Sequence, residues 1–192
     1  MKKLFAGILA GALILSSMSV FAGETEKEIT EINWEDMVAA NEQSDNDLIG
    51  QGDFVTFDEI AVQMWVPNVL QPVELTDEDK ENGYIGYFQT AEEDAAAAVQ
   101  YVDVDGMSLD EYMEYLQGTD GVEDAEYVIV NGLQCISYDI PDTDTTCISF
   151  ETQAGYILEF SFSPMSDDGF QAVIAFMGAS IMPEAEAETE AA

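Results

Sequence analysis

The sequence contains no histidine and no arginine, and its only basic side chains are four lysines. Without histidine, it lacks the usual general base of serine and cysteine hydrolases and the commonest metal ligand. Without arginine or a glycine-rich phosphate loop, it is poorly equipped for nucleotide binding or phosphoryl transfer. Because 40 acidic side chains guarantee some close carboxylate pairs, no single pair indicates glycoside hydrolysis. We therefore predict that the protein is not an enzyme, and we keep a small carboxylate-dependent hydrolase as the catalytic alternative.

Acidic side chains greatly outnumber basic ones. Forty Asp and Glu residues give the chain a formal net charge of −36. Such a surface repels nucleic acid and anionic membranes, so neither is an expected partner. The same acids attract divalent cations, which keeps an extracellular calcium-binding protein as an alternative function. The acids that cluster in the sequence are Asp103, Asp105, Asp142, Asp144, Asp167 and Asp168.

The first 22 residues have the pattern of a signal peptide. Lys2 and Lys3 precede an apolar run, and small residues lead to a cut between Ala22 and Gly23. The run is too short, and too often interrupted by glycine, for a transmembrane helix of about 20 residues. No second apolar run of spanning length follows. We therefore expect an exported chain, extracellular or periplasmic, without a transmembrane anchor after cleavage.

Composition divides the remaining chain into three parts. Residues 23–52 are polar, apart from a stretch around Trp34 whose apolar spacing predicts a short helix. Residues 53–182 carry regular apolar patterns and predict a single domain. Residues 183–192 read PEAEAETEAA, an acidic, low-complexity tail that we expect to be disordered.

Eight strands and two helices are predicted within the domain. Alternating apolar residues place the strands at 54–57, 60–67, 84–90, 95–104, 125–130, 133–140, 145–151 and 156–162. One helix begins after Ser108, which forms a capping box with Glu111, and ends at Gly118. The other begins after Ser166 and carries an apolar stripe. This order predicts an α+β fold, with a mostly antiparallel sheet and amphipathic helices packed on it.

The segment YVDVDGMSLDEYME, residues 101–114, has some features of an EF-hand calcium loop. With Gly106 at loop position 6, Asp103 and Asp105 stand at positions 3 and 5. Tyrosines then occupy positions 1 and 12, where the loop requires acids. A strand that turns into a helix accounts for every residue. We therefore expect no metal or other cofactor, and Asp103 and Asp105 remain candidates only for a weak cation contact.

The two cysteines, Cys135 and Cys147, lie on predicted neighbouring strands. Matching the apolar positions pairs Ile136 with Phe150, which puts both cysteines on one face but too far apart to bond. A bulge or a shifted register would bring them together, and export permits a disulfide. A Cys135–Cys147 disulfide and two buried free thiols both remain open. A catalytic thiol is not expected, because no histidine and few lysines are present to lower its pKa.

Several segments together resemble the PsbP-like superfamily. They are FVTFDEIAVQMWVP, YIGYF, AAVQYVDVDGMSLDEYMEYL, VNGLQCISYD, GYILEFSFSP and FMGASI, within about residues 53–182. The resemblance is to small exported bacterial members without an assigned activity, and it implies an α-β-α sandwich. It also implies a non-catalytic accessory or binding module. Together with the export signal and the lack of a catalytic set, it leads us to expect a secreted or periplasmic module whose partner is an unidentified protein. The family's partner-binding residues do not map onto any motif of this chain, whose acidity also departs from better-known members.

Overall fold

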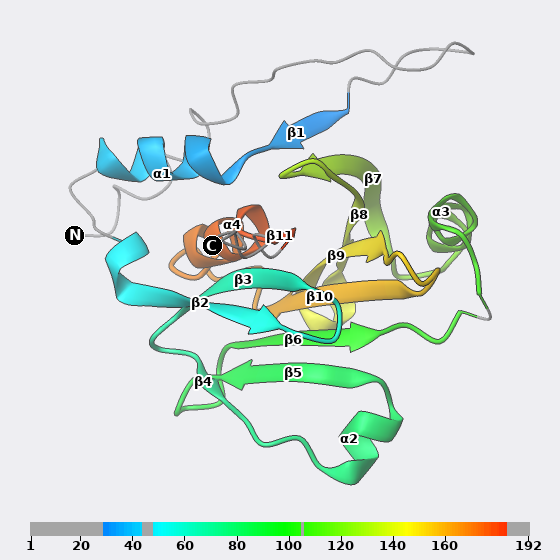
Figure 1. The fold of residues 1–192 in the computed structure, drawn as a ribbon, viewed down its shortest axis with the longest axis horizontal. Helices are drawn as coiled ribbons and strands as arrows, with labels where there is room; N and C mark the ends of the chain where they lie inside the picture. Colours follow the sequence, from blue (N-terminus) through cyan, green and yellow to red (C-terminus); the bar gives the residue numbers. More distant parts are fainter. Residues whose placement is uncertain (1–28, 44–47, 105, 184–192) are drawn as a thin grey trace, which may run out of the picture.

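The computed structural model describes residues 29–43, 48–104 and 106–183, which form two sheets and several helices (Figure 1). The strands of the larger sheet are β1 (Thr30–Ile32), β4 (Gln71–Pro72), β5 (Tyr84–Gln89), β6 (Ala96–Tyr101), β7 (Glu123–Val130), β8 (Leu133–Ile140), β9 (Thr145–Glu151) and β10 (Ile157–Ser163). Those of the smaller sheet are β2 (Gly52–Phe57), β3 (Val62–Pro67) and β11 (Met182–Pro183). The helices are α1 (Trp34–Glu42), α2 (Asp77–Glu81), α3 (Leu109–Gln117) and α4 (Gln171–Ala179), with short 3-10 helices η1 (Ile49–Gln51) and η2 (Pro141–Thr143).

The strand order of the larger sheet is β1-β7-β8-β9-β10-β6-β5-β4, and that of the smaller sheet is β11-β3-β2. Neighbouring strands are antiparallel, except that β1 runs parallel to β7. Every strand predicted for the domain is present with somewhat shifted ends, and the two predicted helices correspond to α3 and α4. The predicted α+β class, with a mostly antiparallel sheet and helices packed on it, is confirmed.

Different elements cover the two faces of the larger sheet. One face carries Phe160 and Phe162 of β10, and the smaller sheet and α4 pack on it; we call it the aromatic face. The opposite face carries Ile157 and Glu159 of the same strand, and α3 packs on it; we call it the helix face. Side chains alternate between the faces along each strand, so β10 contributes to both cores.

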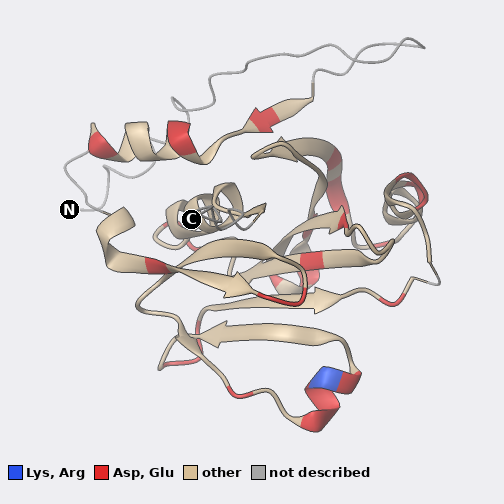
Figure 2. Ribbon diagram, in the orientation of Figure 1, with Lys and Arg blue, Asp and Glu red and all other residues tan. Residues whose placement is uncertain are grey.

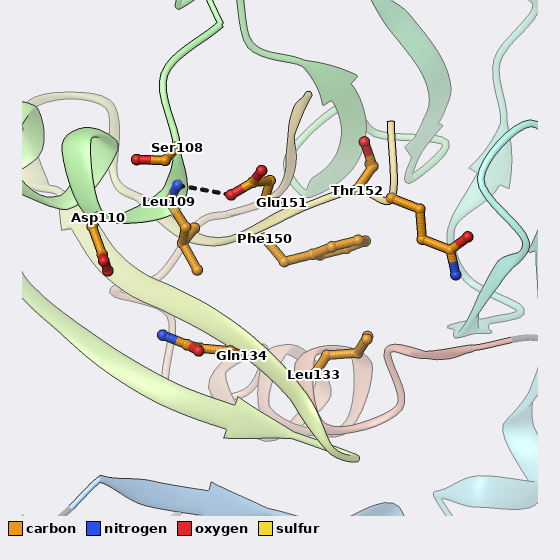
Figure 3. Close-up of a pocket in the computed structure, with 9 residues that line it drawn as sticks. Ser108, Leu109, Asp110, Leu133, Gln134, Phe150, Glu151 and Thr152 are labelled. Carbon is orange, nitrogen blue, oxygen red and sulfur yellow. Dashed lines mark hydrogen bonds between the residues drawn. The ribbon is translucent and has the colours of Figure 1, made fainter. Parts of the chain in front are cut away.

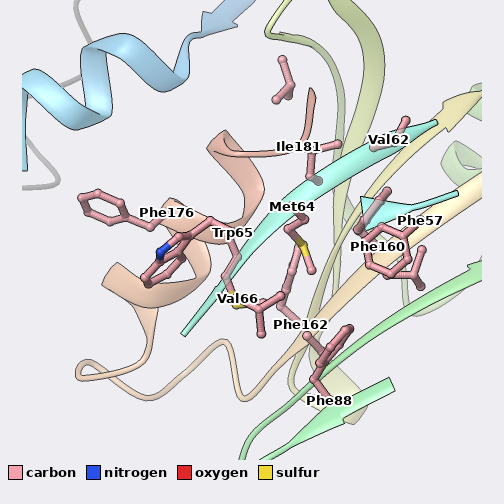
Figure 4. Packing of buried hydrophobic residues seen from close by; sticks show 14 of the residues in the cluster. Phe57, Val62, Met64, Trp65, Val66, Phe88, Phe160, Phe162, Phe176 and Ile181 are labelled. Atoms are coloured by element: carbon pink, nitrogen blue, oxygen red, sulfur yellow. The ribbon is translucent and has the colours of Figure 1, made fainter. Parts of the chain in front are cut away.

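Ring-to-ring contacts join the two sheets across the aromatic face (Figure 4). Phe57 of the smaller sheet packs edge-on against Phe88 and Phe160, with centroid separations of 6.4 and 5.8 Å. At the α4 end, a Cβ added to Gly178 would come within 2.8 Å of Ile148, so glycine lets the helix lie close to the sheet. This interlocking apolar packing fixes how the two sheets and α4 sit on one another.

The N-terminal segment packs against the domain, and the predicted domain boundary at residue 53 therefore lies too far along the chain. β1 pairs with β7 in the larger sheet, and α1, the helix predicted around Trp34, contacts α4. The Trp34 ring packs edge-on against Phe54 and Phe176, at centroid distances of 5.5 and 6.0 Å. These contacts attach the segment to the outer side of α4 and to the smaller sheet.

The Asn131–Gly132 turn between β7 and β8 has a second role beyond reversing the chain. Both residues have positive φ, 47° and 82°, as this hairpin turn requires. The Asn131 side chain also accepts a hydrogen bond from the Trp34 backbone N–H at 2.7 Å. Its amide group donates to the carbonyl oxygens of Ala179 and Ile181, both at 2.8 Å. One asparagine therefore links the hairpin, the start of α1 and the end of α4.

The C-terminal helix begins later than predicted, and Ser166 does not cap it. The Ser166 hydroxyl donates to the Asp144 carboxylate at 2.7 Å. Asp167 lies in the turn before the helix, where its Oδ1 accepts hydrogen bonds from the backbone N–H groups of Gly169 and Phe170. The N-cap residue of α4 is Phe170, which makes no side-chain capping hydrogen bond. Pro183, predicted as the start of the acidic tail, pairs with the smaller sheet as part of β11.

Some predictions fall on residues that the structure does not describe. The signal peptide and its cleavage between Ala22 and Gly23 are among them, as is the tail from residue 184 onward. In the described ranges, none of the helices combines the length and the apolar character needed to cross a membrane.

Candidate functional site

An open pocket of about 400 Å³ lies where α3 meets the ends of β8 and β9; we call it the α3 pocket (Figure 3). Its lining residues come from the first turn of α3, the start of β8, the end of β9 and the turn after it. They are Ser108, Leu109, Asp110, Leu133, Gln134, Phe150, Glu151, Thr152 and Gln153. The pocket therefore combines residues from three elements that are far apart in the sequence.

The start of α3 is held in place by two carboxylates. Ser108 accepts a hydrogen bond from the Glu111 backbone N–H, and the Glu111 carboxylate accepts from the Ser108 backbone N–H, which confirms the predicted capping box. These hydrogen bonds from Ser108 lower the pKa of the exposed Glu111 carboxyl. The Glu151 carboxylate on β9 accepts from the backbone N–H of Leu109 at 3.1 Å (Figure 3). Together they satisfy first-turn donors that would otherwise attract an anion.

The α3 pocket has an apolar part and a polar part. Leu109, on the helix face, is 7% exposed, whereas Phe150, 5% exposed, and the half-buried Leu133 belong to the aromatic face. The side-chain amides of Gln134 and Gln153 are exposed and have no hydrogen-bond partner among the described residues. The pocket thus offers apolar surface next to unpaired amide groups, a combination typical of binding sites.

The two carboxylates that line the pocket are each oriented by a hydrogen bond to one of their two oxygens. Oε2 of Glu151 takes the hydrogen bond from Leu109, and Oδ1 of Asp110 accepts one from the Tyr127 hydroxyl at 2.8 Å. Burial, and then the hydrogen bond to Asp110, raise the pKa of Tyr127 to about 12, so that hydroxyl remains a donor at neutral pH. The second oxygen of each carboxylate accepts no hydrogen bond from the described residues.

The hydroxyls of the pocket are engaged in local structure. Ser108 donates to the Glu111 carboxylate at 3.0 Å and also accepts from its backbone N–H. Thr152 donates to the Tyr156 carbonyl at 3.1 Å and accepts from its backbone N–H at the same distance. Because each hydroxyl already has a donor and an acceptor as neighbours, both residues shape the pocket and neither is placed as a nucleophile.

A second group of polar side chains lies beneath α3, on the helix face. This buried polar cluster consists of the buried Tyr112, Tyr138 and Glu159 and the half-buried Gln100. The hydroxyls of Tyr112 and Tyr138 lie 3.0 Å apart, Tyr138 donates to Glu159, and the Gln100 amide donates to the other Glu159 oxygen at 3.1 Å. Burial raises the pKa of Tyr112 to about 12 and that of Tyr138 further. The members partner one another, so we expect the cluster to stabilise the fold.

The candidate cation ligands are dispersed or already engaged. Asp103 is exposed, and Asp105 lies outside the described residues. The Asp144 carboxylate accepts hydrogen bonds from the backbone N–H and hydroxyl of Ser166, which brings the 142–144 and 166–168 turns together. Within the described ranges, no three acids or cysteines come together as a metal site would require.

The cysteines lie on opposite faces of the sheet, and both are free. The predicted register is wrong by one residue, because Cys135 pairs with Phe150 and Tyr138 pairs with Cys147. Cys135 therefore belongs to the aromatic face and Cys147 to the helix face. Burial raises the pKa of Cys135 to about 12 and raises that of Cys147 as well, which disfavours the reactive thiolate form of both.

Sequence patterns did not identify the α3 pocket. The capping box located its first turn, but Phe150 and Glu151 looked like ordinary strand residues. The contact between Leu109 and Glu151 joins positions 42 apart in the sequence, and no local motif predicts it.

Comparison with known proteins places the fold. No protein-family model matches the chain, and no match was found among curated proteins. Among solved structures, the chain is similar to PsbP of the cyanobacterium Synechocystis sp. PCC 6803, with a TM-score of 0.50. The fold is PsbP-like. The match covers 73% of this chain and 97% of the cyanobacterial chain, at 14% sequence identity. At that identity the PsbP-like fold is shared, while residue roles are not transferred, and the resemblance predicted for the domain is confirmed at the level of fold.

Proposed function

We propose that the protein is an exported, non-catalytic accessory module that binds another protein. The α3 pocket carries this proposal, because it pairs apolar surface with polar groups that are oriented by the protein yet unpaired. The hydroxyls of this pocket are held in local hydrogen bonds, which favours a binding role over one as nucleophiles. The PsbP-like fold supports the proposal, since that fold accommodates accessory modules.

Site-specific photo-crosslinking in the producing cell tests this function. A benzoylphenylalanine at Gln153 would sit on the rim of the α3 pocket, and the same residue at Gln71 would sit on β4, at the far edge of the sheet. We expect one discrete protein adduct from position 153 and none from position 71. The absence of an adduct at 153, or identical adducts from both positions, would contradict the proposal.

A further inference from the structure

The geometry points to a basic side chain, lysine or arginine, as the group that a partner protein inserts into the α3 pocket. This inference rests on the proposed function and adds the chemistry of the contact. It predicts that the partner presents a cationic segment to the end of the sheet where β8, β9 and α3 meet.

Charge supports a cationic occupant. The pocket is lined by Asp110 and Glu151 and by no basic residue. Lys80 is the sole basic side chain in the described ranges, and Figure 2 shows it on α2, with acidic residues distributed over the other elements. α2 contacts β5, which β6 and β10 separate from β9. The described part of the chain therefore supplies no cation to the pocket, and a partner's cation would meet a charge that the described residues leave uncompensated.

The shape of the pocket suits a side chain with an apolar stem and a charged end. Leu109, which Figure 3 shows beside Glu151, provides apolar surface for methylene groups. The free oxygen of Glu151 and the side-chain carbonyls of Gln134 and Gln153 supply acceptors for an ammonium or guanidinium group. The apolar stem would thus contact apolar surface, and the charged end would contact oxygen acceptors.

The acceptors are already oriented before a partner arrives. The Leu109 backbone N–H holds one oxygen of Glu151, and the Tyr127 hydroxyl holds one oxygen of Asp110. Fixing these carboxylates in advance lowers the entropy that binding would otherwise cost. A metal ion is a poorer fit, because only two carboxylates face the pocket and each already uses one oxygen. A divalent cation normally requires more oxygen ligands than remain.

NMR titration of the ¹⁵N-labelled protein with the peptide acetyl-Gly-Lys-Gly-amide tests the inference. Acetyl-Gly-norleucine-Gly-amide has a similar stem without the charge and serves as the control ligand. Calcium chloride at matched ionic strength tests the metal alternative. We expect lysine-dependent shifts confined to residues 108–110, 133–134 and 150–153. Equal shifts with norleucine, larger shifts with calcium, or shifts spread over all acidic surfaces would overturn the inference.

Glu151→Gln removes the charge while keeping an oxygen that accepts from Leu109, so the start of α3 is preserved. Its matched control is Glu92→Gln, which removes one charge from the exposed β5–β6 turn. We expect Glu151→Gln to weaken lysine-peptide binding about fivefold, and Glu92→Gln to leave it unchanged. Equal weakening by both would show charge screening alone and would overturn the inference. Should Glu151→Gln unfold the protein, Asp110→Asn, which keeps the acceptor for Tyr127, replaces it.

The crosslinking and titration results separate the two proposals. A partner adduct at position 153 that Glu151→Gln leaves unchanged would refute the basic side chain and preserve the binding function. The absence of any adduct would refute the binding function itself.

Discussion

Strand β10 presents Leu158, Phe160 and Phe162 to one face of the larger sheet, and Ile157, Glu159 and Ser161 to the other. Both faces are buried beside this strand, yet their chemistry differs. The aromatic face joins two sheets through rings and aliphatic groups, while the helix face encloses hydroxyls, an amide and a carboxylate that bind one another. Apolar burial can be satisfied by any close contact, whereas buried polar groups need directed partners.

The buried polar cluster and the α3 pocket differ in how completely their carboxylates are hydrogen-bonded. Glu159, beneath α3, has hydrogen-bond partners for both carboxylate oxygens. Glu151, at the end of α3, has a partner for one. Carboxylates of one type therefore serve structure where their hydrogen bonds are complete and remain available for binding where they are not. Mutations on the two faces can test the first of these two roles, the contribution to stability.

The largest effect is expected on the aromatic face. Phe160 is fully buried, and its ring stacks on Phe150 and meets Phe57 edge-on. Phe160→Ala should lower the free energy of unfolding by about 3–5 kcal/mol, because it removes apolar contacts and leaves a cavity. Urea unfolding followed by circular dichroism measures the change. Tyr156→Ala, at a side chain 60% exposed, is the control and should cost far less. Equal losses for the two variants would contradict the packing described.

A smaller effect is expected on the helix face. Tyr138→Phe keeps the ring but removes the hydroxyl that lies between Tyr112 and Glu159. The loss should be about 1–3 kcal/mol, because the buried Glu159 carboxylate then keeps only its hydrogen bond from the half-buried Gln100. Tyr115→Phe provides the matched control, since Tyr115 is 52% exposed. If Tyr138→Phe were neutral in urea unfolding, the cluster would not contribute to stability.

The contrast between the faces also explains what sequence patterns could predict. The start of α3 and the Asn131–Gly132 turn follow from local chemistry, namely a capping box and a pair of residues that tolerate positive φ. The strands of the domain follow from alternation. Their register does not, because β8 and β9 are buried on both faces around Cys135, Ile136 and Cys147. A one-residue shift then still buries apolar side chains, so apolar matching cannot select the register.

Long-range contacts set the remaining limits of prediction. Asn131 was predictable as a turn residue, but its hydrogen bonds to Trp34 and Ala179 depend on segments 97 and 48 positions away. The short strand β1 gave no alternating pattern, since it has only three residues. The α3 pocket likewise exists only once Glu151 reaches Leu109. Features built from one segment were predictable, and features built between segments were not.

The two cysteines allow the faces to be compared within one molecule. Each thiol is buried, Cys135 under the smaller sheet and α4, and Cys147 under the single helix α3. We expect both to resist iodoacetamide in the native protein, and both to react after unfolding. In timed native labelling, Cys147 should react several-fold faster than Cys135. Moving α3 away from the sheet disrupts less of the structure than separating the two sheets, so that opening is the more frequent one. Mass spectrometry of peptides measures each rate. A mass two hydrogens lower, without alkylation after unfolding, would instead reveal a disulfide.

The smallest effect is expected at alkaline pH, and it again distinguishes the helix face. Burial raises the pKa of Tyr112 from 10.0 to about 12; the hydrogen bond with Tyr138 lowers the pKa, and the charges of Glu159 and Cys147 raise it. Above pH 10 the unfolded chain loses this proton while the folded chain keeps it, so stability should fall as pH rises from 10 toward 12. Tyr112→Phe should reduce the slope of unfolding free energy against pH in that window, by about 1 kcal/mol or less at pH 10.5. Below pH 9 the variant's stability should not vary with pH relative to the native protein, because Tyr112 is then protonated in both states. A slope that the substitution leaves unchanged would place the alkaline sensitivity elsewhere, with Cys135 on the aromatic face as the next group to test, since its pKa is also raised to about 12.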